Sequence, residues 1–180
     1  MNQSKIIPAL RKKEDTKYLY SSPAQKVFLM FGELSVLPGT VRQIQGLGKS
    51  VYIHTDLMKG LSQDKEALGY IAETIQPTGI ISTKSHMIKI AKSLGMETIH
   101  HLFIIDTNAF FTGIERVLQS KPDAVEIMPG LMPSVIRELQ QHIQVPMYVG
   151  GLVKTSAQVD ALVGCGVAGV VTGQTELWGN

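Results

Sequence analysis

Short apolar runs rich in β-branched residues recur along the chain, and this repetition restricts the fold more than any other sequence feature. Successive runs start 19 to 28 residues apart. Runs of this length, without strict alternation of apolar and polar residues, indicate strands that are buried on both faces. The runs are VFLMF at 27–31, VYIHTD at 51–56, GIIST at 79–83, TIHHLFIID at 98–106, AVEIMPG at 124–130, PMYVGG at 146–151 and AGVVTG at 168–173.

Helical patterns fill the intervals between these runs. Pro133 is expected to open one helix, and Ser156 is expected to cap another. Strands and helices that alternate with this period predict parallel β-α-β units and therefore an α/β fold. We expect one domain, residues 1–180, with the architecture of a TIM-type (β/α) barrel. A doubly wound open sheet is the alternative.

The number of runs bears on how such a barrel closes. Seven runs are one short of the eight strands of a complete barrel. We expect an incomplete, seven-stranded barrel, and the alternative is an eighth element hidden within residues 1–26. The least regular stretch, residues 32–48, is expected to form a mobile loop because it contains Pro38, Gly39, Gly46 and Gly48.

Composition and charge narrow the class of protein. Hydrophobic residues make up 44% of the 180 residues and aromatic residues only 6%, which suits parallel strands covered by helices. The formal net charge of +2 does not by itself indicate nucleic-acid binding. The sequence has no signal-peptide pattern and no apolar run near the ~20 residues of a membrane span. We therefore expect a cytoplasmic protein that does not bind membranes.

Two glycine-containing turns follow the last two strands. Gly150 and Gly151 end one strand, and Thr172 and Gly173 end the next. In barrels, phosphate groups often bind between the loops after the last two strands, because glycine lets the backbone approach the anion closely. These four residues are therefore expected to contact a phosphate. Lys154 is a candidate cation for the same group, and solvent exposure explains it equally well.

Polar residues also end the earlier strands, and in a parallel barrel all these ends converge on one mouth. Asp56 and Glu126 could accept hydrogen bonds from hydroxyl groups, and Lys59 and Lys84 could balance a phosphate dianion. With His54, they predict a pocket for a phosphorylated polyol. The adjacent His100 and His101 are interpreted as structural, and no motif indicates a metal site, a cofactor or catalytic residues.

Several longer segments together resemble one known family, the glycerol uptake operon antiterminators. The resemblance extends from about residue 5 to the end of the chain. It implies a regulator that responds to glycerol 3-phosphate as its effector. When loaded, such a regulator acts on the leader of nascent messenger RNA and prevents transcription termination. The segments are VYIHTDLMKGLS at 51–62, GIISTKSHMIKIAKSLG at 79–95, FIIDTNAF at 103–110, PDAVEIMPGLMP at 122–133, PMYVGGLV from 146 and VVTGQTELWG from 170.

The residues themselves support the ligand half of this expectation better than the RNA half, because no RNA-binding signature or aromatic platform is present. The RNA-binding candidates are two basic groups, and self-association into a homo-oligomer is left open. The alternative function is a barrel enzyme that acts on a small phosphorylated polyol, either an isomerase or a phosphodiesterase. The two basic groups are Arg11, Lys12 and Lys13 near the amino terminus, and Arg42 and Lys49 in the expected loop.

Overall fold

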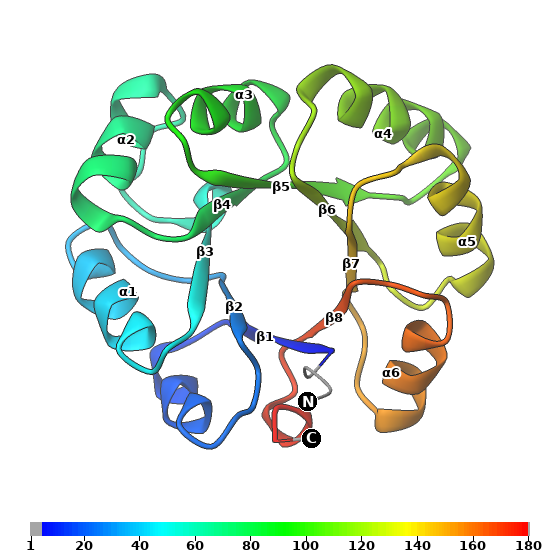
Figure 1. Cartoon of the computed structure of the whole chain (residues 1–180), viewed down its shortest axis with the longest axis horizontal. Helices are drawn as coiled ribbons and strands as arrows, with labels where there is room; N and C mark the ends of the chain where they lie inside the picture. The colour runs from blue at the N-terminus through cyan, green and yellow to red at the C-terminus, as the bar shows by residue number, and fades with distance from the viewer. Residues whose placement is uncertain (1–4, 180) are drawn as a thin grey trace.

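The computed structural model describes residues 5–179, so residues 1–4 and 180 of the expected domain lie outside the described part. Eight parallel strands close into a barrel in sequence order, and helices surround it (Figure 1). The predicted TIM-type barrel is confirmed, and the open-sheet alternative is wrong. The strands are β1 Ile6–Leu10, β2 Lys26–Leu29, β3 Ser50–His54, β4 Gly79–Ser82, β5 Glu97–Phe103, β6 Ala124–Met128, β7 Met147–Gly150 and β8 Gly169–Thr172.

The expectation of seven strands is wrong, because the eighth strand is β1 within residues 1–26. All five residues of β1 are buried. Pro8 obscures the strand pattern, since proline cannot donate a ladder hydrogen bond. In the structure, Pro8 pairs with Thr172 of β8, and pairing with β2 begins only at Ala9. The proline therefore lies before the part of β1 that pairs with β2.

Six α-helices cover the barrel, and short helical turns complete the connections. The stretch 32–48 is mainly helical, which corrects the expectation of a loop. Its helix buries Leu37, Val41 and Ile44 on one face. The proline in the first turn of this helix is compatible with a helix start, but in the sequence it looks like a loop signal. The helices are α1 Leu37–Gln45, α2 Lys65–Tyr70, α3 Ser85–Ser93, α4 Thr107–Ser120, α5 Pro133–His142 and α6 Ser156–Val163. The turns are η1 Lys13–Leu19, η2 Thr55–Leu57, η3 Ile71–Ile75 and η4 Thr175–Leu177.

Two helix starts had been predicted. Pro133 opens α5 as expected. The cap of α6 is Thr155 and not Ser156, and Thr155 and Gln158 form a reciprocal capping box. None of the described helices is long and apolar enough to cross a membrane.

The barrel interior is closed at the amino-terminal ends of the strands. Phe28 makes edge-to-face contacts with Tyr52 and Tyr148, with ring centroids 5.7 and 5.5 Å apart. The Tyr52 hydroxyl accepts a hydrogen bond from Lys26 Nζ at 2.9 Å and donates one to Glu97 Oε2 at 2.6 Å. The large cavity of the described structure lies at the opposite, carboxyl-terminal end.

Candidate functional site

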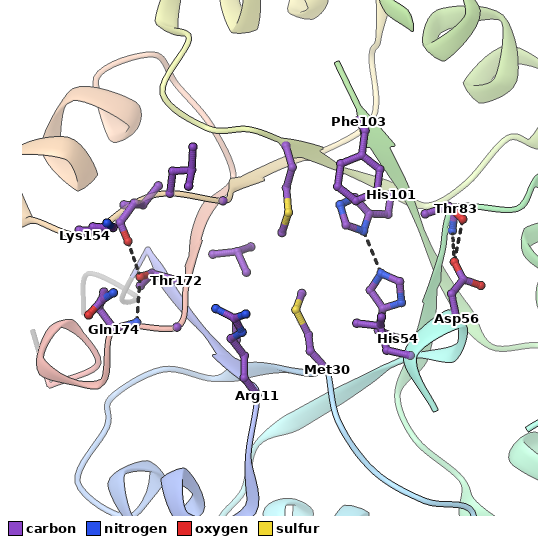
Figure 2. Close-up of a pocket in the computed structure, with 18 residues that line it drawn as sticks. Arg11, Met30, His54, Asp56, Thr83, His101, Phe103, Lys154, Thr172 and Gln174 are labelled. Atoms are coloured by element: carbon purple, nitrogen blue, oxygen red, sulfur yellow. Dashed lines mark hydrogen bonds between the residues drawn. The ribbon is translucent and has the colours of Figure 1, made fainter. Parts of the chain in front are cut away.

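A cavity of about 680 Å³ opens at the carboxyl-terminal ends of the strands (Figure 2). Every strand, or the loop that follows it, contributes a residue to its wall. This is the end where barrel proteins bind ligands, and the volume suits a small molecule. The polar side chains come from two sides. Arg11, Lys154 and Thr172 lie toward one side, and His54, Asp56 and His101 toward the other.

Three of the four residues expected to contact phosphate line this cavity, namely Gly151, Thr172 and Gly173. Gly151 and the exposed Leu152 both have a positive φ, +78° and +62°, so the chain turns sharply after β7. The Thr172 hydroxyl donates to the Val153 carbonyl at 2.9 Å and accepts from the Gln174 amide at 3.1 Å. Thr172 therefore ties the loops after β7 and β8 together.

Gly150 does not reach the cavity wall, although the sequence grouped it with Gly151. A Cβ atom at this position would lie 2.9 Å from Val171 Cβ. Gly150 is thus needed for the close approach of β7 to β8. The amides of Lys154 and Thr155 are also engaged, because both donate to Gln158 Oε1. An anion at this wall would meet the loop backbone and side chains, and not the start of α6.

Arg11, which the sequence assigned to RNA, is part of the cavity wall. Its side chain crosses Gly173, where a Cβ atom would lie 3.0 Å from Arg11 Cδ. The guanidinium group points toward the cavity (Figure 2). Arg11 and Lys154 are the two cations of the wall, and neither forms an ion pair within residues 5–179.

Asp56 reaches the cavity, but its carboxylate is already occupied by hydrogen bonds. Oδ1 accepts from Ser82 Oγ at 2.9 Å, and Oδ2 accepts from the Thr83 amide at 2.7 Å and from Thr83 Oγ1 at 2.8 Å. Burial opposes ionisation of Asp56, but these hydrogen bonds outweigh it and hold its pKa below the ordinary value. The carboxylate mainly joins η2 to the end of β4.

His54 and His101 meet at the floor of the cavity. The distance between His54 Nε2 and His101 Nδ1 is 2.8 Å. Burial lowers the pKa of both imidazoles, and burial together with His54 lowers that of His101 to about 3. Both rings are therefore neutral near neutral pH. His101 had been interpreted as structural, because alternation along β5 shows that two adjacent histidines face opposite ways but not which one faces inward.

Glu126 lies in the barrel interior beneath this floor and does not line the cavity. Its Oε2 atom is 3.8 Å from His101 Nδ1. Burial raises the pKa of Glu126 to about 8, so the carboxyl group is protonated at neutral pH. The contact with His101 is therefore one between neutral groups, not an ion pair. The described residues contain no group of three or more histidine, cysteine or acidic side chains arranged to hold a metal ion.

Two lysines predicted for the ligand lie outside the cavity wall. Lys59 is 82% exposed and is 3.8 Å from Glu33 Oε1, which it meets across a bridge between two loops. Lys84 is exposed and precedes α3. Both follow strand ends, as expected, but their side chains do not turn inward to line the cavity.

The five RNA-binding candidates are spread over different parts of the barrel. Lys12 and Lys13 directly follow Arg11 and are exposed near the mouth. Arg42 is exposed on α1 in the outer layer of helices. Lys49 lies at the amino-terminal end of β3, where its Nζ donates to the carbonyls of Ser22 and Ala24 at 2.7 Å each. The structure therefore does not unite these residues in one basic surface.

Comparison with known proteins agrees with this geometry. Residues 6–178 match the sequence profile of the glycerol-3-phosphate responsive antiterminators. The chain belongs to this family. This confirms the resemblance of the sequence segments to the antiterminators, which are regulators.

Similar proteins cover nearly the whole chain. A glycerol uptake operon antiterminator regulatory protein from Listeria monocytogenes str. 4b F2365 is 33% identical, with a TM-score of 0.93 over 99% of this chain and 96% of that one. An antiterminator-related protein from Thermotoga maritima MSB8 is 26% identical, with a TM-score of 0.86 over 97% and 98% of the two chains. The protein YgcP of Escherichia coli (strain K12) is 32% identical over 99% of this chain and 93% of its own length.

Enzymes share the architecture without sharing the sequence. An aldolase, QR15, has a TM-score of 0.70 at 9% identity over 97% of this chain and 90% of its own. Such a likeness shows the barrel fold alone, because barrels carry many unrelated functions.

Proposed function

We propose that this antiterminator family member binds glycerol 3-phosphate in the barrel cavity and, when loaded, acts on the leader of messenger RNA of glycerol-utilisation genes to prevent transcription termination. One observation supports the ligand most strongly. Arg11 and Lys154 are two cations that form no ion pair with any residue of the described chain, and they lie on the wall that also carries the glycine turns. Family membership supports the RNA half. Action on a nascent transcript implies a cytoplasmic protein.

The phosphate is assigned to the wall formed by Gly151, Gly173, Arg11 and Lys154. A phosphate monoester carries about −1.5 to −2 charges at neutral pH and needs cationic or N–H donors. The Arg11 guanidinium offers a planar fork for two phosphate oxygens, and Lys154 offers a point charge. Gly173 leaves room for the Arg11 side chain, because a Cβ atom at this position would lie 3.0 Å from Arg11 Cδ and press on it.

Arg11 also suggests how the effector could influence RNA binding. It is followed directly by Lys12 and Lys13, and Lys13 begins η1. An effector shifts an equilibrium only through its different affinities for the two states. Capture of Arg11 by the phosphate would fix the start of the segment that carries these lysines. We therefore propose that this segment, and not residues 32–48, links effector binding to RNA binding.

Reciprocal binding measurements test the proposal. Calorimetry should show glycerol 3-phosphate binding, and a gel shift on the leader RNA should strengthen when this ligand is present. If the ligand strengthens RNA binding by some factor, RNA must strengthen ligand binding by the same factor. Double replacement of Lys12 and Lys13 by Gln should weaken RNA binding and reduce its salt dependence by about one to two units of slope. Identical ligand affinities with and without saturating RNA would contradict the coupling.

The enzyme alternative remains open to a direct test. His54 and His101 are buried in the cavity and could take part in proton transfer. Phosphorus NMR of glycerol 3-phosphate incubated with the protein should show no turnover if the protein is a regulator. Appearance of inorganic phosphate or an isomeric ester would support the enzyme.

A further inference from the structure

Two adjacent histidines of β5 have opposite environments: both ring nitrogens of His100 have hydrogen-bond partners, and one ring nitrogen of His101 has none within the described chain. His100 faces outward and is fully buried. Its Nδ1 lies 2.9 Å from Ser120 Oγ and its Nε2 lies 3.3 Å from the Thr83 carbonyl oxygen. His101 faces the cavity, and only its Nδ1 is hydrogen-bonded. Within the described chain, His101 Nε2 is buried and has no hydrogen-bond partner.

The surroundings of His101 hold its ring in one orientation. His54 meets one ring nitrogen, and the ring of Phe103 packs against it with centroids 4.3 Å apart. His54 Nδ1 and both carboxyl oxygens of Glu126 are also buried without partners among the described residues. Buried polar groups in folded proteins are almost always hydrogen-bonded. Glu126 lies beneath the cavity, but His54 and His101 line its floor. This histidine pair is polar, oriented and incompletely satisfied, which points to a ligand.

The protonation of the two imidazoles defines which chemistry fits. Two neutral rings share one proton in the bridge between His54 Nε2 and His101 Nδ1. One ring thus carries its proton on its outer nitrogen, and the other ring has a bare outer nitrogen. The pair presents one donor and one acceptor. A hydroxyl group can serve either, whereas a phosphate oxygen is an acceptor only and would lack cations here.

We infer that His101 recognises the hydroxyl end of the effector, with Nε2 hydrogen-bonded to a hydroxyl group of glycerol 3-phosphate. This inference rests on the proposed function and adds the residue that selects a hydroxylated phosphate ester over a plain one. His54 is a positioning residue, because it fixes the proton of the bridge. The two walls then orient the ligand, with its charged end at Arg11 and its uncharged end at His101.

Calorimetry with two esters tests the assignment. Glycerol 3-phosphate and propyl phosphate share the phosphate and the three-carbon chain, but propyl phosphate has no hydroxyl groups. His101→Phe should weaken binding of glycerol 3-phosphate by about 10- to 30-fold and change binding of propyl phosphate by less than about twofold. His101→Gln, which restores a polar group near the same position, should recover part of the loss. His100→Phe is the matched control and should leave both affinities unchanged.

The outcomes separate this assignment from the proposed function. Equal losses of both esters in His101→Phe, or no loss at all, would overturn the role of His101 and leave the proposed function in place. Failure of the unaltered protein to bind either ester would overturn both. If His101→Phe does not fold, nitrogen NMR of the unaltered protein decides instead. Glycerol 3-phosphate should shift the His101 Nε2 resonance and propyl phosphate should not, while His100 stays unchanged with both. Equal shifts of His101 with both esters would overturn the assignment.

Discussion

Both ends of the barrel interior carry polar side chains, but the two groups differ in burial and in how far their hydrogen bonds are completed. At the amino-terminal end, Lys26, Tyr52 and Glu97 are joined by hydrogen bonds of 2.9 and 2.6 Å. At the carboxyl-terminal end, His101 and Glu126 keep buried polar atoms without partners in the described structure. A completed network contributes to stability, whereas an incomplete one beside a cavity costs stability and is available to a ligand.

The largest expected effect is a loss of ligand affinity, and it is expected for a substitution at the cavity end of the barrel only. Arg11→Ala should weaken glycerol 3-phosphate binding by about 100-fold or more, because it removes a charge-assisted pair of hydrogen bonds. Lys26→Met, at the closed end, should lower the melting temperature and leave affinity within about twofold. Calorimetry and thermal melts measure both. A similar affinity loss in the two variants would show that the ends are not independent.

The second effect concerns stability and pH. Because the pKa of Glu126 is raised from 4.5 to about 8, the folded state holds a proton that the unfolded state loses between these values. The part of the burial cost that depends on ionisation is therefore absent below pH 4.5 and grows as pH rises toward 8. The groups facing Glu126 are His101 on β5 and Tyr148 on β7, and neither is charged at neutral pH.

Glu126→Gln should consequently stabilise the protein by up to about 3 kcal/mol at pH 7 and flatten the pH dependence of stability between 4.5 and 8. Glu97→Gln, which weakens the completed network, should instead destabilise by about 1 kcal/mol. Urea unfolding at several pH values measures both. Loss of stability in Glu126→Gln at pH 7 would mean that its carboxyl group is satisfied after all.

A third substitution tests whether Asp56 contacts the ligand or only stabilises the cavity wall. Asp56→Asn should reduce stability by about 1 to 2 kcal/mol at pH 7, because it disturbs the bonds to Ser82 and Thr83. The lowered pKa of Asp56 means that this contribution is present above its ordinary pKa and is lost as pH falls through the folded value. Affinities for glycerol 3-phosphate and inorganic phosphate should fall together. A selective loss of the glycerol ester would restore Asp56 as a hydroxyl ligand.

The smallest effect is expected at Lys154. Arg11 and Lys154 are both exposed on the cavity wall, but the lysine offers a point charge without the planar fork of arginine, so its attraction for a phosphate is weaker and is screened by solvent and salt. Lys154→Met should weaken ligand binding about 3- to 10-fold at low ionic strength, and the difference should shrink as salt is added. Titrations at two salt concentrations check this. A loss that does not depend on salt would indicate a direct, desolvated contact.

Period and glycine spacing were sufficient to predict the barrel and the wall after β7 and β8. The position of Arg11 in the cavity wall was not predicted, because it depends on β1, which Pro8 concealed. His101 was missed because strand alternation gives opposite faces for His100 and His101 without saying which is inside. Glu126 was expected at the barrel mouth but lies beneath the cavity floor, since depth along a strand depends on the register with its neighbours.

Thr172 connects the cavity wall to Trp178 near the end of the described chain and, through its pairing with Pro8, to β1. The Trp178 indole Nε1 donates to the Thr172 carbonyl at 2.9 Å, and the Trp178 carbonyl accepts from Ser22 Oγ at 2.5 Å. Because Ile6 pairs with Val170, the barrel can close only after β8 has left the ribosome, and the Trp178 contacts form later still. A nascent chain therefore has no complete cavity until nearly all of the described chain has been synthesised.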